Sequence, residues 1–558
     1  MISPDNNSSV EISSPDAINP DPINQDPINQ DTADRQWGSF TQVAPWVLDQ
    51  QKISWQPQAE ALRVSAQREI PVLTKPSRVP PVARLVVVVW VLALALLPWF
   101  VKKRRNKFPS SEDSNAYVSL RMRKAVERLG STYIKLGQII SSGEGLFPTE
   151  LVDEFKRCRD QVPAESFDRV RLVVEQDLGA QIEQVFARFD TTALAAASIA
   201  QVHSAKLMTG EEVVVKVQRP QVSKLVRKDL RVMAWLAPHL VGRIKIAALA
   251  NPPALVELFA ETIVEELDFR IEANNMLEIA KVLRDLDQNG YVVPRPHPQL
   301  VTRRTLVMQR LDGFKFDDVV GMKNAGIDTE AVIRTGMIAF MEGAMIHGLF
   351  HGDLHGGNLF VLPDGRTALL DFGIVGRLTG ARRMAFLRLM LSATTNHVKG
   401  QVEAMRDLGA LPLDTDIDAV IADLNLGMPV IDPTTLSGEE LVKEVQRIVK
   451  AMLGYGAKMP KELMLYVKNM VFLDGAIARL APELDLIGEI QAISMLFAQR
   501  HGERLGRELG IDHTQIEINL DSFKAGLGVD ASTNKMTYSE LQKRRELIQK
   551  RMREHVGR

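Results

Sequence analysis

The sequence predicts an α+β fold with two unequal lobes, in which the first lobe contains the β-strands and the second is mainly helical. Three observations lead to this prediction. Short apolar runs typical of β-strands occur at residues 212–217 and 300–306, with a long helix expected between them at about 253–285. From about residue 327 to residue 558 the apolar residues recur with helical spacing. One compact group of polar motifs, at residues 351–373, interrupts that helical pattern.

The composition is that of a globular protein. Of 558 residues, 45% are hydrophobic and 25% are charged, which excludes wholesale disorder and a collagen-like fold. The 68 basic and 69 acidic residues leave a net charge of -1, which argues against a general nucleic-acid binder, because such domains are usually strongly basic. The single cysteine, Cys158, excludes an intramolecular disulfide and suits a reducing compartment.

The first 84 residues are predicted to form two segments outside the globular core. Residues 1–36 contain an imperfect five-residue repeat rich in Asp, Pro and Asn, with seven acidic residues and one basic residue. Such a sequence opposes helix and strand formation and predicts a disordered acidic tail. Residues 37–84 form a membrane-proximal segment with Trp37, Trp46 and Trp55 at intervals of nine. Whether these tryptophans meet a membrane or pack inside the protein stays open.

Residues 85–101 are apolar throughout and predict a transmembrane or membrane-anchoring helix. Seventeen helical residues rise about 25 Å, slightly less than a hydrocarbon core of about 30 Å, but Val82 and Ala83 can extend the helix if the side chain of Arg84 snorkels. Five basic residues follow within residues 102–107, a positive-inside signal that predicts a cytoplasmic location for the rest of the chain. A buried core helix and an interfacial helix are the alternatives.

On this prediction the near-neutral charge is an average over two sides of a bilayer. The tail carries a net charge of -6, so the remainder carries +5, with basic residues concentrated beside the apolar segment and at the end of the chain. That end, residues 541–558, holds seven basic and two acidic residues. It predicts a solvated charged helix, with a contact to an anionic lipid surface as the alternative.

The motif group at residues 351–373 points to phosphoryl transfer. Asp353 and Asn358 have the spacing of a protein-kinase catalytic loop, H-x-D-x-x-x-x-N, and Asp371 begins an Asp-Phe-Gly triplet thirteen residues after Asn358. Two short apolar runs flank a turn at residues 363–365 and predict a hairpin that returns Asp371 towards Asn358. We therefore expect Asp353 to act as the base or to orient the acceptor, and Asn358 and Asp371 to hold Mg²⁺.

The alternation of His351, Asp353 and His355 also fits a zinc site, because on a strand the three side chains share a face and are suitable ligands. Against this interpretation, Gly356 and Gly357 favour a loop, and the kinase-type interpretation explains more residues. A hydrogen-bonded loop histidine is the simpler interpretation of His355.

Two further segments fit a nucleotide site. Lys216 lies in an apolar strand-like run, where a lysine is unfavourable unless it is paired, and kinases place the lysine that grips phosphate oxygens in this setting. Ahead of it, Ala195-Ala196-Ala197-Ser198 stands where kinases carry a glycine-rich loop. Since alanine lacks the positive-φ freedom of glycine, this loop should be stiffer and approach phosphates differently.

Together these features resemble the UbiB (AarF) family of atypical protein-kinase-like proteins. The alanine-rich loop, a K-x-G-Q motif at Lys135-Leu136-Gly137-Gln138, an E-x-D element at Glu266-Leu267-Asp268 and the loop at 351–358 match the family hallmarks in order. The resemblance covers roughly residues 115–490. It implies a two-lobed protein-kinase-like fold with a small β-containing first lobe, a helical second lobe and an added N-terminal helical K-x-G-Q extension.

The resemblance also implies roles for individual residues. The K-x-G-Q helices would fold over the site where an ordinary kinase binds a protein substrate, with Lys135 projecting into the site and meeting Glu266. Lys216 would pair with Glu272, and Asp353, Lys216 and Lys135 would form the catalytic set. The residues expected to bind the nucleotide are Ala195, Ala196, Ala197, Ser198, Lys216, Glu272, Met308, Gln309, Glu266 and Gln138.

The implied function is that of a membrane-associated kinase or ATPase that uses ATP (or ADP) and Mg²⁺ and supports isoprenoid-quinone biosynthesis or lipid homeostasis. Expected partners are anionic membrane lipids and quinone-biosynthesis proteins or isoprenoid quinone precursors, with no nucleic acid. The expected location is the plasma (inner) membrane of a bacterium, with the kinase-like domain on the cytoplasmic side. A small-molecule phosphotransferase of the aminoglycoside or choline kinase type stays open as an alternative, as does a nucleotide-gated lipid-binding scaffold with little turnover.

The chain departs from the family pattern at Gly356, where proline is frequent, and at Gln309 in a hinge-like strand, where an acid is usual. We expect Gln309 to affect local packing, since hinge backbone groups normally hold adenine. The predicted divisions are a tail (1–36), a membrane-proximal segment (37–84), an anchor (85–101), the K-x-G-Q extension (115–180), the first lobe (181–312), the second lobe (313–500) and a C-terminal helical region with a basic end (501–558).

Overall fold

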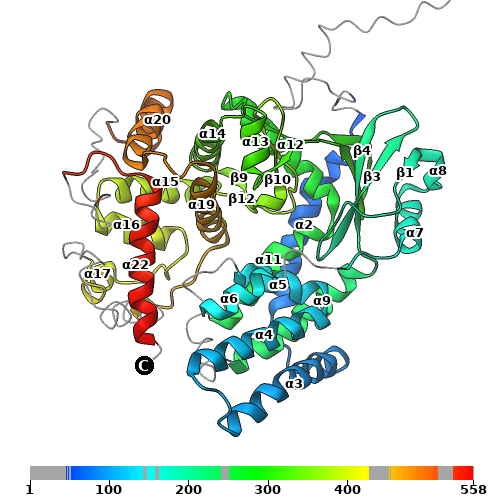
Figure 1. The fold of residues 1–558 in the computed structure, drawn as a ribbon, viewed down its shortest axis with the longest axis horizontal. Helices are drawn as coiled ribbons and strands as arrows, with labels where there is room; N and C mark the ends of the chain where they lie inside the picture. The colour runs from blue at the N-terminus through cyan, green and yellow to red at the C-terminus, as the bar shows by residue number, and fades with distance from the viewer. Residues whose placement is uncertain are drawn as a thin grey trace, which may run out of the picture.

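The computed structural model describes residues 46, 48, 52–141, 148–157, 163–240, 251–426, 451–452, 454–512, 524 and 532–556. The predictions made for the acidic tail (residues 1–36), for Trp37 and for Cys158 lie outside the described residues. Within them the chain is a mixed α+β protein, as the sequence predicts (Figure 1).

An antiparallel sheet forms the core of the first lobe, with the strand order β1-β3-β4-β7-β6 and with β2 paired to β3. The strands are β1 Phe186–Phe189, β2 Ala195–Ala196, β3 Ala200–Leu207, β4 Glu212–Gln218, β6 Pro296–Val301 and β7 Thr305–Gln309. The predicted strand at 212–217 is confirmed as β4. The predicted run at 300–306 is wrong as a single strand. It holds the end of β6, a turn in which the N–H of Thr302 donates to the carbonyl of Thr305 at 2.8 Å, and the start of β7, because antiparallel neighbours need a reversal of the chain.

The helix expected at about 253–285 is also interrupted. The chain forms α11 (Pro252–Ile263), a 3-10 turn η2 (Glu265–Leu267) and then α12 (Phe269–Asp285). Asp268 causes the break, since its backbone is extended (φ -140°, ψ 107°) and its side chain caps the N–H of Arg270 at 3.1 Å. The new helix α12 packs on β6 and β7 and turns one face towards the site described below.

The second lobe combines two small sheets with helices. One sheet has the order β5-β11-β10-β8 and the other pairs β9 with β12. Its elements are β5 Tyr291–Val292, β8 Phe314–Lys315, α13 Val319–Asn324, α14 Thr329–Glu342, β9 Leu349–His351, β10 Leu359–Val361, β11 Thr367–Leu369, β12 Val375–Arg377, α15 Gly380–Thr394, α16 Val398–Asp407, α17 Ile417–Asp423, α19 Lys461–Leu480, α20 Leu486–Leu509 and α22 Tyr538–Val556. The predicted hairpin between β10 and β11 is confirmed, with Leu359 opposite Leu369.

Helices from the first half of the chain lie against the first lobe (Figure 1). They are α2 Gln56–Thr74, α3 Val82–Arg104, α4 Ser111–Leu129, α5 Ser131–Ser141, α6 Thr149–Lys156, α7 Phe167–Leu178, α8 Ile182–Val185 and α9 Val222–Leu240. Glycines with positive φ end two of these helices, since α4 stops at Gly130 and α7 at Gly179. In the described part of the chain, α3 is the helix that is long and apolar enough to cross a membrane.

Two of the three regularly spaced tryptophans pack inside the protein. The indole N–H of Trp46 donates to the carbonyl of Pro296 at 3.0 Å, and that of Trp55 donates to the carbonyl of His297 at 3.1 Å. Trp55 is buried within the main hydrophobic core. The question that the sequence left open is therefore answered in favour of packing for these two residues.

Candidate functional site

Lys216, Glu272 and Asp371 form a compact ionic cluster where the two lobes meet. β4 positions Lys216, α12 positions Glu272, and Asp371 follows β11. The ammonium of Lys216 lies 2.7 Å from a carboxylate oxygen of Glu272 and 2.9 Å from one of Asp371. Burial alone would lower the pKa of Lys216, but the charges of Asp371 and Glu272 outweigh it and raise the pKa above its usual value. The expected pair of Lys216 with Glu272 is present, and Lys216 stays charged.

The Asp-Phe-Gly segment is held in place by α12. The N–H of Phe372 donates to Glu272 at 3.3 Å, and the side-chain amide of Asn275 donates to the carbonyl of Phe372 at 2.8 Å. Burial disfavours the charged form of Asp371, but Lys216, the N–H of Gly373 and Lys135 together lower its pKa to about 2. Asp371 is therefore ionised at neutral pH, as a metal ligand must be.

Asn358 and Asp371 are brought together by the hairpin, as predicted. The N–H of Leu370 donates to the carbonyl of Asn358 at 3.0 Å, and the side-chain amide of Asn358 donates to the carbonyl of Asp353 at 3.0 Å. This last bond uses the amide N–H, so the amide oxygen of Asn358 remains as an acceptor, and the backbone bond pairs Asn358 with Leu370, the residue just before Asp371. A carboxylate and an amide oxygen are hard donors of the kind that Mg²⁺ prefers, and the residues present therefore fit this ion.

The alternative zinc interpretation is wrong for the described residues, among which no group of three His, Cys, Asp or Glu side chains is placed to hold a metal. Both ring nitrogens of His351 are occupied, because Nδ1 accepts from the N–H of Asp353 at 3.2 Å and Nε2 contacts the carbonyl of Asp371. His355 caps the following turn, accepting from the N–H of Gly357 at 3.1 Å. The interpretation of His355 as a hydrogen-bonded loop histidine is confirmed.

The K-x-G-Q motif lies on α5, next to this cluster. The ammonium of Lys135 is 2.8 Å from a carboxylate oxygen of Glu266 in η2, the contact that the family resemblance implies. Burial would lower the pKa of Lys135, but Glu266, Asp353 and Asp371 outweigh it and raise the pKa above its usual value. Gln138 follows one helical turn later on α5. Lys135 thus places a positive charge beside the catalytic loop.

Sequence reasoning missed two residues of α19 that hold the catalytic loop. The ammonium of Lys468 contacts a carboxylate oxygen of Asp353. The side chain of Asn469 accepts from the N–H of Leu354 at 3.0 Å and donates to the carbonyl of His351. No local motif marks these residues, which lie 115 to 118 positions after the loop residues that they contact.

Asp353 is held as a carboxylate. Its burial favours the neutral form, but Lys468, Lys135 and His355 outweigh burial and hold the pKa of Asp353 well below its usual range. An acid this strong is a poor general base at neutral pH. Orientation of an acceptor by its negative charge is therefore the role that the geometry favours.

The alanine-rich loop is a tight hairpin between β2 and β3. Ala195 and Ala196 pair with β3, and the N–H of Ala197 donates to the carbonyl of Ala200 at 2.8 Å. Arg219 holds the loop in place, since its guanidinium donates to the carbonyl of Ala197 at 3.0 Å. Ser198 is buried, and its 3% exposure places it inside the fold rather than on the surface of the loop.

Met308 and Gln309 lie within β7. Met308 is opposite Val214, and the N–H of Gln309 donates to the carbonyl of Arg295 at 2.9 Å. The side chain of Gln309 accepts from the N–H of Arg295 at 3.4 Å. Gln309 thus takes part in local packing, as expected, and its own N–H is directed at Arg295 rather than at an adenine.

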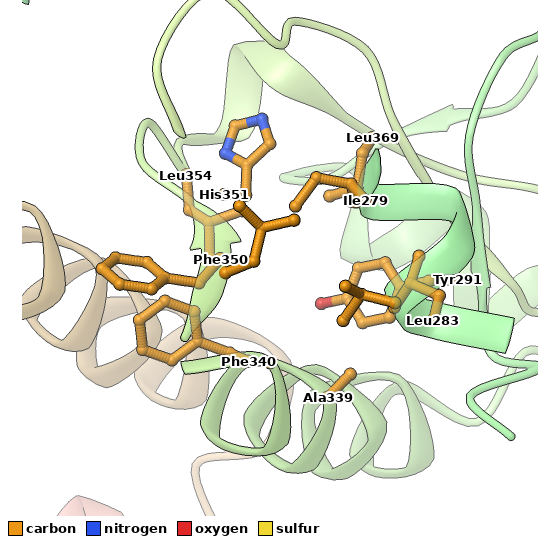
Figure 2. A pocket seen from close by; sticks show the side chains of 12 residues that line it. Ile279, Leu283, Tyr291, Ala339, Phe340, Phe350, His351, Leu354 and Leu369 are labelled. Atoms are coloured by element: carbon orange, nitrogen blue, oxygen red, sulfur yellow. The ribbon is translucent and has the colours of Figure 1, made fainter. Parts of the chain in front are cut away.

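A small apolar cavity of about 40 Å³ lies behind the catalytic loop. In Figure 2 the phenol of Tyr291 and the side chain of Leu283 face Phe340 and Phe350 across this space. Its lining is almost entirely apolar, and burial raises the pKa of Tyr291. A cavity of this size is a packing defect between α12 and the second lobe, with no room for a nucleotide.

Comparison with known proteins finds one matching family model and several relatives. The family model for the ABC1 atypical kinase-like domain matches residues 157–405. An uncharacterized protein of Mycobacterium tuberculosis is 33% identical over 368 residues, covering 65% of this chain and 75% of its own. An uncharacterized aarF domain-containing protein kinase of Arabidopsis thaliana chloroplasts is 31% identical, with 70% and 77% covered. The probable protein kinase UbiB of Azotobacter vinelandii is 31% identical, with 71% of this chain and 73% of its own covered.

Among solved structures, the complex of Rv3197 with erythromycin, from Mycobacterium tuberculosis, is 21% identical to this chain. The match has a TM-score of 0.35 and covers 62% of this chain and 91% of that chain.

Proposed function

Because the chain belongs to the ABC1 (UbiB, aarF) family of atypical kinase-like proteins, we propose that it is a membrane-associated kinase or ATPase that acts on Mg²⁺-bound ATP. The observation that carries this proposal is the convergence of one lysine, two carboxylates and one carboxamide from separate elements on a single site. These residues are Lys216, Asp353, Asp371 and Asn358. The combination matches the needs of phosphoryl transfer, which depends mainly on positioning and on charge stabilisation.

Each residue has a distinct task in this proposal. Lys216, oriented by Glu272, would hold phosphate oxygens of the nucleotide. Asn358 and Asp371 would hold Mg²⁺, which neutralises charge that develops on the phosphate oxygens. Asp353, kept ionised by its neighbours, would orient the hydroxyl or water that attacks the γ-phosphorus. The bond from that phosphorus to the leaving oxygen of ADP then breaks.

The position of Lys135 favours water or a small acceptor over a protein hydroxyl. By resemblance to the family, α5 would occupy the approach that a protein substrate needs, and the contact of Lys135 with Glu266 at 2.8 Å fits that arrangement. This feature supports an ATPase or a small-molecule kinase within the family.

Purified full-length protein should release inorganic phosphate from ATP only when Mg²⁺ is present. The assay is run with and without phosphatidylglycerol vesicles, because the proposed membrane partner is anionic. Absence of Mg²⁺-dependent release under every condition would count against an enzyme and favour the scaffold alternative. Transfer of labelled phosphate to an added aminoglycoside or to choline would favour the small-molecule phosphotransferase alternative.

We further propose that the protein supports isoprenoid-quinone biosynthesis at a bacterial inner membrane, with quinone precursors or quinone-biosynthesis proteins as partners. The support is its similarity to proteins named UbiB. Deletion of the gene should change the levels of quinone precursors in extracted lipids, and the wild-type gene should restore them while the Lys216→Met variant should not. An unchanged lipid-quinone profile after deletion would contradict this role.

A further inference from the structure

The helix α3 is the strongest candidate for a membrane contact, and its neighbours restrict how it can meet a bilayer. By length and composition it is able to cross a membrane, since its 23 residues rise about 34 Å. A helix that crosses a bilayer places its two ends on opposite sides. The segments before and after α3 therefore decide between a span and a helix that lies along one surface.

The segment before α3 is docked on the kinase-like body. The carboxylate of Glu69 on α2 accepts a bidentate contact from Arg227 of α9, with one distance of 2.8 Å. Arg63 of α2 is 4% exposed and donates to the side chain of Asn275 on α12 at 2.9 Å. Asn275 is the residue that also holds the carbonyl of Phe372. The helix α2, which precedes α3, thus contacts the residue that supports the Asp-Phe-Gly segment. It therefore lies on the same side of a membrane as the candidate site.

The inner face of α3 is fixed to the same body along its length. The predicted snorkelling of Arg84 does not occur, because its guanidinium pairs at 2.6 Å with Asp229 of α9, which is fully buried, and donates to the carbonyl of Leu129 at 2.8 Å. Val88, about one turn further on, and Ala95, about three turns further on, are also buried. Figure 1 shows α3 lying alongside α4 rather than projecting from the molecule.

A second arginine, Arg121 of α4, contacts α3 near its C-terminal end. Pro98 lacks an N–H, so it cannot satisfy the carbonyl of Leu94 within the helix. Arg121 of α4 donates to that carbonyl at 3.3 Å and to the carbonyl of Ala95 at 2.6 Å. Because Arg121 is charged, the face of α3 that it contacts cannot lie in the hydrocarbon core of a bilayer at the level of Leu94 and Ala95.

The outer face of α3 is apolar and exposed. Its residues recur with helical spacing and end beside the basic cluster, which comprises Lys102, Lys103, Arg104, Arg105 and Lys107. The exposed apolar side chains of α3 are Val82, Val86, Val87, Val89, Trp90, Leu94, Leu97, Phe100 and Val101. The exposed stripe gives α3 an apolar surface that can enter a membrane, and the basic residues at its end can meet the headgroups of an anionic leaflet.

We infer that α3 lies in the plane of the membrane and inserts its outer face into one leaflet that contains anionic lipid, without crossing to the other side. The inference rests on the membrane association proposed above and specifies its geometry. It replaces the transmembrane prediction by the interfacial alternative. The basic cluster would meet lipid phosphates, and the chain on both sides of α3 would share the cytoplasmic face. The charge of the chain is then no longer divided between two compartments.

Single cysteines on either side of α3 test this topology in the full-length protein. In a Cys158→Ser background, Val79→Cys lies just ahead of α3 at a site that is 73% exposed, and Met208→Cys lies in the β3–β4 turn at a site that is 61% exposed. A membrane-impermeant maleimide should label neither cysteine in intact bacterial spheroplasts and both cysteines in inverted membrane vesicles. Labelling of Val79→Cys in intact spheroplasts, with Met208→Cys protected, would overturn the inference and restore the span.

A charge on the outer face tests the lipid contact. Trp90→Glu should lower the fraction of protein that floats with phosphatidylglycerol-containing vesicles by about tenfold, because an aromatic side chain would no longer be buried in lipid. Leu194→Glu, at a similarly exposed apolar site in the first lobe, should float like wild type. Equal flotation of both variants would overturn the inference. Absence of wild-type flotation would overturn membrane association with it, and neither result depends on ATP turnover.

Discussion

Replacement of Asp371 by asparagine should reduce Mg²⁺-dependent ATP hydrolysis by about 100-fold or more, the range seen when a group that stabilises developing charge is removed. Asp371 is the ionised oxygen donor beside Asn358, and it also contacts Lys216 at 2.9 Å. The amide of asparagine keeps the size of the side chain but loses the charge. Affinity for Mg²⁺ should fall together with the contact that orients Lys216.

The measurement is phosphate release at saturating ATP over a range of Mg²⁺ concentrations. Asp364→Asn is the matched control, because Asp364 lies in the exposed turn of the same hairpin and pairs at 2.7 Å with Arg366. The control should hydrolyse ATP within about twofold of wild type, since exposed ion pairs contribute little. Equal activity of Asp371→Asn and wild type would contradict the assignment of the site. Thermal unfolding of both variants checks that the fold is kept.

The parts of the site that follow from local sequence were predictable. Asp353, Asn358 and Asp371 lie within one loop and one hairpin, so their spacing along the chain fixes their proximity. That Lys216 forms an ion pair was also predictable, because a lysine in a buried strand requires a charged partner. The identity of that partner, Glu272, came from a family resemblance, since 56 residues separate the two.

Other features depend on packing that no local pattern encodes. Lys468 and Asn469 lie on an ordinary amphipathic helix, and only the packing of α19 on α14 and β12 brings them to the catalytic loop. The sequence around Asp268 has a strong helical pattern, which predicts one continuous helix. The helix is nevertheless interrupted there, because the side chain of Asp268 caps the start of a new helix. The hydropathy of α3 is that of a membrane span, and the inference of an in-plane helix rests on tertiary contacts such as those with Asp229 and Arg121.

The charges of the site form one system. Three lysines lie among four carboxylates, and each lysine contacts at least one of them. The residues are Lys135, Lys216, Lys468, Glu266, Glu272, Asp353 and Asp371. Removal of one charge from such a buried set leaves its partner uncompensated, which costs more than the loss of an exposed pair. With all seven groups ionised the set would carry one excess negative charge, but burial raises the pKa of Glu272 to about 7 and raises that of Glu266, so the net charge of the set depends on pH.

Replacement of Lys468 by methionine should lower the rate of ATP hydrolysis by about tenfold to 100-fold, because Lys468 contacts the carboxylate of Asp353. Methionine keeps most of the length and apolar surface of the side chain. Asn469, which holds the loop backbone, is unchanged. The loss should therefore appear in kcat more than in KM for ATP, because the nucleotide contacts assigned to Lys216 remain.

The pH dependence separates an electrostatic role of Lys468 from a structural one. The charge of Lys468 lowers the pKa of Asp353, so its removal should raise that pKa, partly opposed by Lys135. Below its pKa Asp353 is protonated and cannot orient the acceptor, so the acidic limb of the pH–rate profile should move to higher pH in Lys468→Met. Lys468→Arg should keep the limb in place, and so should Lys458→Met, which alters an exposed lysine just ahead of α19. A uniform loss of rate with an unmoved acidic limb would contradict the proposed control of Asp353 by the charge of Lys468.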